Sequence, residues 1–274
     1  MENRKKRPIA VFDSGIGGLT VLSEIRSHLP AEDLIYFGDT ARVPYGTKSP
    51  TIISRYAVEV GRFLNRFEPK VFVVACNSMS SVALPVLDGA FRLPLVDVIY
   101  PGAYAAVEFS STGRIGVIAT QATIKSNAYQ HAVRARAPHA EVFGMACPLL
   151  VPAIEEGRGS DDHIVRECLA EYVSPLIEQD IDTLILGCTH YPVISDGISS
   201  VVGEDVKLVD SAKETAHRTR DLLQSLGLLR EGSKPGIMRC YVSDNTEGVA
   251  VQGKLFLGSD MPSVELVHPE QFYE

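Results

Sequence analysis

The feature that most constrains the fold is the alternation of short apolar runs, rich in valine and isoleucine, with longer amphipathic stretches. Parallel strands need helical crossovers and are covered on both faces, so they read as continuous apolar runs separated by helical patterns. The alternation therefore predicts an α/β protein with mainly parallel sheets. The predicted strands are residues 9–12, 34–37, 71–75, 95–99, 115–119, 183–187 and 206–209.

One helix has clear boundary signals. Ser49 can cap its start and Pro50 fits the first helical position. Apolar residues at positions 53, 57, 60 and 64 follow at helical spacing, so the helix is expected to end before Pro69.

Charge and composition exclude several classes of protein. The net charge of -8 gives no positive field that would recruit nucleic acid or an anionic membrane. No apolar run approaches the roughly 20 residues that span a bilayer, and the basic residues 4–7 lead into a strand-like segment rather than a signal-peptide core. A cytoplasmic protein is expected. The sequence leaves the oligomeric state open, with a homodimer as one arrangement.

The cysteines argue against disulfides and zinc. The five cysteines, at positions 76, 147, 168, 188 and 240, include no C-x-x-C pair, and an odd count does not suggest a disulfide framework. Structural zinc sites draw closely spaced cysteine or histidine pairs from short loops, and no such pair is present. We expect reduced thiols and no metal site.

Four polar loops follow predicted strands, where open α/β sheets place their ligands. They are residues 13–18 (DSGIGG), 38–46 (GDTARVPYG), 76–78 (CNS) and 188–192 (CTHYP). The first loop combines backbone amides with a helix start, which favours an anionic group, but its spacing is not a nucleotide-binding fingerprint. A tight strand-to-helix turn explains the same residues.

Cys76 and Cys188 occupy matching positions, because each follows an apolar strand run and precedes hydrogen-bonding side chains. A neighbouring donor or cation that stabilises the thiolate turns such a thiol into a base near neutral pH. The other three cysteines are interpreted as structural. His190, two residues after Cys188, is a candidate for orienting substrate or exchanging protons with the thiol. The matching layout suggests two related α/β units.

At these residues the chain resembles the glutamate racemases of the aspartate/glutamate racemase superfamily. The matching segments are residues 11–20, 36–46, 75–78, 148–155 and 186–192, which span residues 8–213 in the expected order. The resemblance implies two similar α/β domains facing each other across an active-site cleft. One is expected to comprise residues 1–97 with 210–274 and to carry Cys76, and the other residues 98–209 with Cys188.

The resemblance also implies which residues act and on what. Cys76 and Cys188 are the implied catalytic residues, without metal or other cofactor, and D-glutamate for peptidoglycan is the implied product. The implied substrate-binding residues are Asp13, Ser14, Tyr45, Gly46, Asn77, Ser78, Thr189 and His190. Ser78 stands where the family more often has threonine, and the hydroxyl is kept. Asp39 and Tyr45 have an alternative role in stabilising their own loop. Glu155 resembles an acidic residue near the cleft, although Glu156 competes for the assignment. No role is assigned after residue 213.

Two thiols on opposite walls of a cleft suit inversion of an α-carbon, since one base removes a proton while the other delivers one to the opposite face. Backbone amides with Asn77, Ser78 and Thr189 would stabilise the charge that develops toward an enediolate. Two alternatives stay open: a racemase of aspartate or another amino acid, and a catalytically silent amino-acid-binding regulator. A decarboxylase of the superfamily would need only one cysteine.

Overall fold

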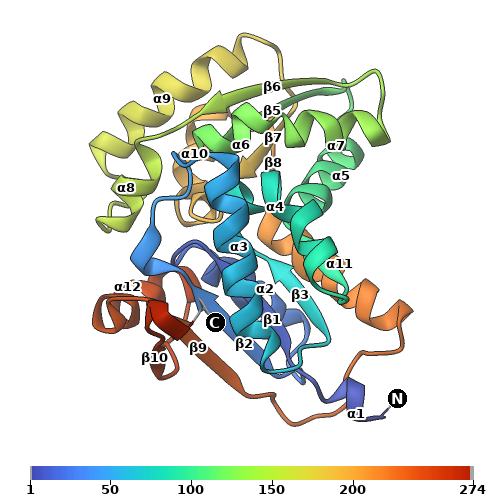
Figure 1. The fold of residues 1–274 in the computed structure, drawn as a ribbon. Helices are drawn as coiled ribbons and strands as arrows, with labels where there is room; N and C mark the ends of the chain where they lie inside the picture. Colours follow the sequence, from blue (N-terminus) through green and yellow to red (C-terminus); the bar gives the residue numbers. More distant parts are fainter. Residues whose placement is uncertain (1, 272–274) are drawn as a thin grey trace.

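The computed structural model describes residues 2–271, whose strands form two sheets that are parallel throughout (Figure 1). The six-stranded sheet has the order β10-β9-β2-β1-β3-β4, and the four-stranded sheet has the order β6-β5-β7-β8. The first comprises β1 (Ile9–Asp13), β2 (Leu34–Gly38), β3 (Val71–Val74), β4 (Leu95–Asp97), β9 (Met238–Val242) and β10 (Val264–Leu266). The second comprises β5 (Arg114–Ala119), β6 (Glu141–Ala146), β7 (Thr183–Gly187) and β8 (Lys207–Asp210). The predicted fold class, with two similar α/β units, is confirmed.

The strand order repeats between the two halves of the chain. The first four strands pair in the order 2-1-3-4, and strands five to eight pair as 6-5-7-8, which is the same order shifted by four. Cys76 follows the third strand of its half and Cys188 the third strand of the other. The two thiols therefore hold topologically equivalent places.

Helices cover both faces of each sheet. They are α1 (Glu2–Lys5), α2 (Leu19–His28), α3 (Pro50–Asn65), α4 (Asn77–Ala90), α5 (Ile99–Phe109), α6 (Gln121–Ser126), α7 (Ala128–Arg136), α8 (Leu150–Glu155), α9 (His163–Ile177), α10 (Ser195–Val202), α11 (Ser211–Ser225) and α12 (Thr246–Leu257). Along β1 the side chains alternate: Ile9 and Val11 join a buried cluster that includes α2, whereas Ala10 and Phe12 join one with α3 and α4. The α2 cluster continues into β7, so one core spans both sheets.

The predicted helix after Ser49 is confirmed as α3, and Ser49 Oγ accepts a hydrogen bond from the Ile52 amide at 3.4 Å. The predicted strand 95–99 is too long. Asp97 Oδ1 accepts from the amides of Ile99 at 2.7 Å and Tyr100 at 2.9 Å, which turns the chain into α5 directly after β4. The strands β6, β9 and β10 were not predicted. β6 is only partly buried, and Gly144 interrupts its apolar residues.

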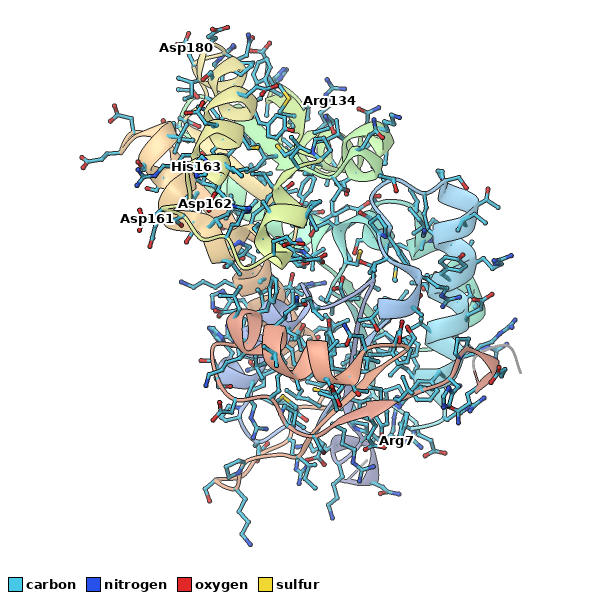
Figure 2. All side chains as sticks on the ribbon, turned by 90° about the vertical axis from the view of Figure 1, so that its left-hand side faces the viewer. Arg7, Arg134, Asp161, Asp162, His163 and Asp180 are labelled. Carbon is cyan, nitrogen blue, oxygen red and sulfur yellow. The ribbon has the colours of Figure 1, made fainter. Side chains whose placement is uncertain are left out.

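The last part of the chain returns to the first sheet. α11 leaves β8 and packs against α2, and then β9 and β10 extend the edge beside β2. The described residues therefore begin and end on the side of the first sheet (Figure 1). Arg7 in this half and Arg134 in the other lie toward opposite ends of the molecule (Figure 2). The domain division at residues 97/98 and 209/210 stays a prediction.

Within residues 2–271, none of the helices is both long enough and apolar enough to cross a membrane.

Candidate active site

A cavity of about 400 Å³ lies at the carboxyl ends of both sheets. Its walls come from the loops that follow β1, β2, β3, β5, β6 and β7. In each half the strand order reverses beside the first strand of that half, and such a reversal leaves a crevice at the carboxyl edge. Two such crevices face each other here. All ten predicted site residues line this one cavity: Asp13, Ser14, Tyr45, Gly46, Cys76, Asn77, Ser78, Cys188, Thr189 and His190.

Cys76 lies at the junction of β3 and α4, with its side chain only 5% exposed. Its Sγ donates to Ser14 Oγ at 3.3 Å. Burial and the nearby Asp13 carboxylate raise the pKa of the Cys76 thiol to about 12, against a smaller lowering by Ser14. The neighbours of Cys76 therefore favour its thiol over its thiolate, because the nearest charge is negative and the residue is buried.

Asp13 organises the first polar loop. Its Oδ2 accepts from the amides of Gly15 at 3.2 Å and Gly18 at 2.8 Å, and Ser14 Oγ lies 3.5 Å from its Oδ1. These hydrogen bonds form the tight strand-to-helix turn that the sequence of this loop also indicated. The carboxylate also belongs to the cavity wall, so the turn and a substrate contact are compatible.

Cys188 has a different environment, because a histidine lies beside it. His190 Nδ1 is 3.7 Å from Cys188 Sγ, and His190 Nε2 is 3.0 Å from Glu155 Oε1. Burial lowers the pKa of His190, but its hydrogen bonds to Cys188 and Glu155 outweigh that effect and raise the pKa to about 10. The resulting imidazolium lies beside the Cys188 sulfur, so this wall of the cavity carries a positive charge next to its thiol group. Of the two candidate acidic residues, Glu155 is the one that reaches the cavity.

The polar residues after Cys76 connect the two sheets. Asn77 Nδ2 donates to the Tyr129 hydroxyl at 2.8 Å, whereas its buried Oδ1 has no hydrogen-bond partner within the described part of the chain. Ser78 Oγ lies 2.8 Å from Thr120 Oγ1. A buried carbonyl oxygen without a partner is costly, so Asn77 Oδ1 is suited to accept a bond from a ligand.

Tyr45 and Gly46 close the cavity from the loop after β2. The Tyr45 hydroxyl donates to Asp39, whose carboxylate also accepts from Ser243 Oγ at 2.9 Å. Both Asp39 and Tyr45 therefore stabilise their own loop, although Tyr45 also lines the cavity. The Gly46 carbonyl accepts from the Ala122 amide at 2.9 Å, which ties this loop to the second half.

Gly17 permits the closest approach between the two halves. A Cβ at this position would lie 2.4 Å from two atoms of the His190 ring and 2.5 Å from Thr189 Oγ1. Thr20 Oγ1, from the second residue of α2, donates to the Thr189 carbonyl at 3.0 Å. Gly17 therefore allows the first loop to pack against the Cys188 loop.

Several cavity residues were not predicted from the sequence. Cys147 was interpreted as structural, yet it follows β6 and lines the cavity, and its position would have been apparent had that strand been recognised. Thr120 lines the same wall. Phe256 of α12 packs edge-on against His190 with ring centres 5.0 Å apart, so the segment after residue 213 does contribute support. Cys168 and Cys240 are buried outside the cavity lining.

A metal centre with three or more protein ligands does not occur among residues 2–271, since no suitable group of histidine, cysteine, aspartate and glutamate side chains converges there.

Two facing crevices, each with a cysteine after its third strand, place one thiol on each side of a single cavity, which is a site of the racemase type. Over residues 17–219 the sequence matches the Asp/Glu/Hydantoin racemase family, and the chain belongs to that family.

Within the family its near relatives are glutamate racemases. The glutamate racemase of Geobacter metallireducens is 47% identical over 96% of this chain and 97% of its own length. The crystal structure of a glutamate racemase isoform from Bacillus anthracis superimposes with a TM-score of 0.93 at 38% identity, covering 97% of this chain and 98% of that one. The glutamate racemase from Francisella tularensis in complex with D-glutamate gives a TM-score of 0.89 at 41% identity, covering 96% and 98%.

Proposed function

We propose that this chain interconverts L-glutamate and D-glutamate by proton transfer between two thiols and the α-carbon. The observation that carries the proposal is the pair Cys76 and Cys188, which line one cavity from topologically equivalent places in facing sheets. Relatives that cover nearly the whole chain are glutamate racemases, and one of them is solved with D-glutamate. D-glutamate for peptidoglycan is the product that this family membership implies.

The proton balance is simple. For L-glutamate, the Cys188 thiolate takes the α-proton, so a C–H bond breaks and an S–H bond forms. The Cys76 thiol then delivers its proton to the opposite face, which leaves Cys76 as the thiolate. The reverse reaction exchanges the two roles. No electron leaves or enters, and the substrate carries the same atoms before and after.

The difference between the two thiols supports these starting roles. The His190 imidazolium lies beside Cys188, while burial and the Asp13 carboxylate raise the pKa of Cys76. A substrate ammonium group near Asp13 would offset that carboxylate charge and ease formation of the Cys76 thiolate when D-glutamate reacts. Backbone amides at the start of α4, with Ser78 and Thr189 at the cavity wall, are placed to stabilise charge on the substrate carboxylate.

The division of labour is tested with Cys76→Ala and Cys188→Ala and a glutamate analogue that bears a leaving group at the β-carbon. Proton abstraction alone then leads to elimination. Both variants should lose racemisation, because inversion needs an acceptor and a donor. Cys76→Ala should still eliminate from the L form and Cys188→Ala from the D form. Racemisation near the wild-type rate in either variant would refute the two-thiol mechanism, and the reverse enantiomer pattern would refute only the assignment of faces.

Substrate choice and catalysis separate the alternatives. We expect a higher kcat/KM for glutamate than for aspartate, although one methylene is worth only about 1 to 3 kcal/mol in a pocket. Equal or higher kcat/KM for aspartate would favour the aspartate alternative. A regulator that binds amino acids would show affinity without any change in circular dichroism of the substrate over time.

The proposal includes a cytoplasmic location, a reaction without pyridoxal phosphate or catalytic metal, and a homodimer as the arrangement to test by sedimentation. The five cysteines are free, as proteins of reducing compartments keep them. Dialysis against chelator should leave racemisation unchanged, and no absorbance near the roughly 400 nm of a bound aldehyde cofactor is expected. Activity that is lost on dialysis and restored by adding a metal ion or pyridoxal phosphate would contradict a reaction without cofactor.

A further inference from the structure

Two histidines from different helices face each other outside the active site. His28 at the end of α2 and His217 in α11 place their Nε2 atoms 3.0 Å apart. The rings are nearly perpendicular, at 82°, and their centres are 4.6 Å apart. The side chains are 24% and 36% exposed, so an ion from solvent can reach both.

The opposite edges of the rings face hydrogen-bond acceptors. His28 Nδ1 lies 2.9 Å from the Glu24 carbonyl oxygen and 3.6 Å from the Glu24 carboxylate. His217 Nδ1 lies 3.7 Å from Glu214 Oε2. His28 Nδ1 is within hydrogen-bond distance of its acceptor, whereas 3.7 Å is too long for a hydrogen bond from His217 Nδ1. When both Nδ1 atoms carry the ring proton, each Nε2 presents a lone pair to an ion. Histidines that bind metals are oriented by acceptors at their other ring nitrogen in this way.

The distances fit two ligands of one ion. With metal–nitrogen bonds of about 2.1 Å, ligands at a right angle have nitrogens about 3.0 Å apart, whereas tetrahedral ligands need about 3.4 Å. With about 1.15 Å from nitrogen to ring centre, the right-angle arrangement puts the ring centres about 4.6 Å apart. Without an ion the two Nε2 atoms share an N–H···N hydrogen bond, and this bond is bent, because a collinear one of this length would put the ring centres more than about 5 Å apart. The observed 3.0 Å and 4.6 Å match the right-angle arrangement.

We propose that His28 and His217 chelate a divalent transition-metal ion through their Nε2 atoms, with water in the remaining positions. Right-angle nitrogen ligands are those of octahedral or square-planar Ni²⁺ and Cu²⁺, with which imidazole binds well. The site supplies two protein ligands, so it differs from the three-ligand centres that are absent from residues 2–271. It is also separate from the cavity lining, and the racemisation chemistry does not pass through it.

A bound ion would join two segments that position the active site. α2 begins directly after the loop of Asp13 and contacts the Cys188 loop through Thr20. α11 begins where the chain leaves β8 of the second sheet. An ion that binds only the folded state stabilises it by mass action, so the melting temperature should rise with its concentration.

The test is calorimetric titration of the full chain with Ni²⁺, with thermal melting in parallel. The variants are His28→Gln and His217→Gln, and the matched control is His163→Gln, an exposed histidine at the start of α9 (Figure 2). The wild type and the control should bind one Ni²⁺ equally and melt at a higher temperature with it. Each of the other variants should bind at least about 10-fold more weakly and lose the rise in Tm.

Ni²⁺ bound by cysteines would persist in all three variants, and therefore only the loss in His28→Gln and His217→Gln reports on the proposed site. Equal Ni²⁺ affinity in the wild type and in either of these variants would overturn the proposal. A loss of Ni²⁺ affinity in only one of these two variants would also overturn the proposal, since a chelate needs both rings. Unchanged melting temperatures without metal show that the two substitutions leave the fold intact.

Discussion

At the scale of single residues, the two cysteines are equivalent in topology and different in chemistry. Cys188 lies beside a histidine whose positive charge is supported by Glu155, whereas Cys76 lies beside the carboxylate of Asp13. The two thiols therefore face opposite charges, a cation beside Cys188 and a carboxylate beside Cys76. The sequence alone presents the two cysteine loops as near equals.

Replacing Glu155 tests this asymmetry. In Glu155→Gln the carboxylate that helps to raise the pKa of His190 to about 10 is lost, so that pKa should fall. The imidazolium then disappears at lower pH, and the alkaline limb of kcat/KM for L-glutamate should shift toward lower pH. A loss of at least about 10-fold near the wild-type optimum is expected. Glu156→Gln, an exposed neighbour, is the control and should keep the wild-type pH profile. A shift of the pH profile in Glu156→Gln, with none in Glu155→Gln, would assign the support of His190 to Glu156 instead.

Gly17→Ala should disturb the same histidine by contact. The added Cβ would lie 2.4 Å from the His190 ring, so the ring or the loop must move. We expect kcat/KM to fall by about 10-fold or more, since a misplacement of about 1 Å can cost 100-fold. Gly89→Ala is the control, because no atom lies within 4 Å of its added Cβ. Wild-type kcat/KM in Gly17→Ala would show that the close approach has no catalytic importance.

At the scale of secondary-structure elements, one carboxylate fixes the turn that leads into β5. Asp182, just before β7, accepts from Ser110 Oγ at 2.6 Å, from the Ser111 amide at 2.7 Å and from the Thr112 amide at 2.7 Å. Burial opposes its charge, but these hydrogen bonds outweigh burial and hold the pKa of Asp182 well below its usual range. The register between β5 and β7 is thus supported from the loop.

Asp182→Asn should lower the free energy of unfolding by about 1 to 3 kcal/mol at neutral pH, because hydrogen bonds to a charged group are lost. The pKa of this carboxyl is depressed in the folded state, so its contribution is present above the unfolded pKa of about 3.9 and is lost as pH falls through the folded pKa. Urea unfolding at neutral and acidic pH measures both effects. A difference between the two proteins that does not shrink at low pH would contradict this account.

At the scale of the whole molecule, one buried ion pair joins distant parts of the chain. Lys70 Nζ, which is fully buried, pairs with Glu32 and donates to the carbonyls of Lys5 at 2.7 Å and Leu228 at 3.0 Å. Burial lowers the pKa of Lys70 against the opposing effect of Glu32. Lys70 therefore connects the segment before β1, through Lys5, with the segment after α11, through Leu228.

Lys70→Met should destabilise the protein by about 3 to 5 kcal/mol, because Glu32 is left buried without its partner. The double variant Lys70→Met/Glu32→Leu should recover part of this loss, although the bond from the Arg230 amide to Glu32 is also removed. Urea unfolding of both variants provides the measurement. A double variant less stable than Lys70→Met would mean that the charge pair is not the dominant contribution.

The sequence by itself determined the α/β class, most of the strands and the two cysteine loops, because burial along a parallel strand leaves a continuous apolar run and ligand loops follow strand ends. Tertiary structure decided what depends on partners far away in the chain. β6, β9 and β10 gain their place from pairing rather than from pattern. Cys147, Phe256 and the histidine pair acquire their neighbours only through the order of strands and the return of α11 and α12. Local periodicity records which face of a segment is buried, but it does not record which distant segment covers that face.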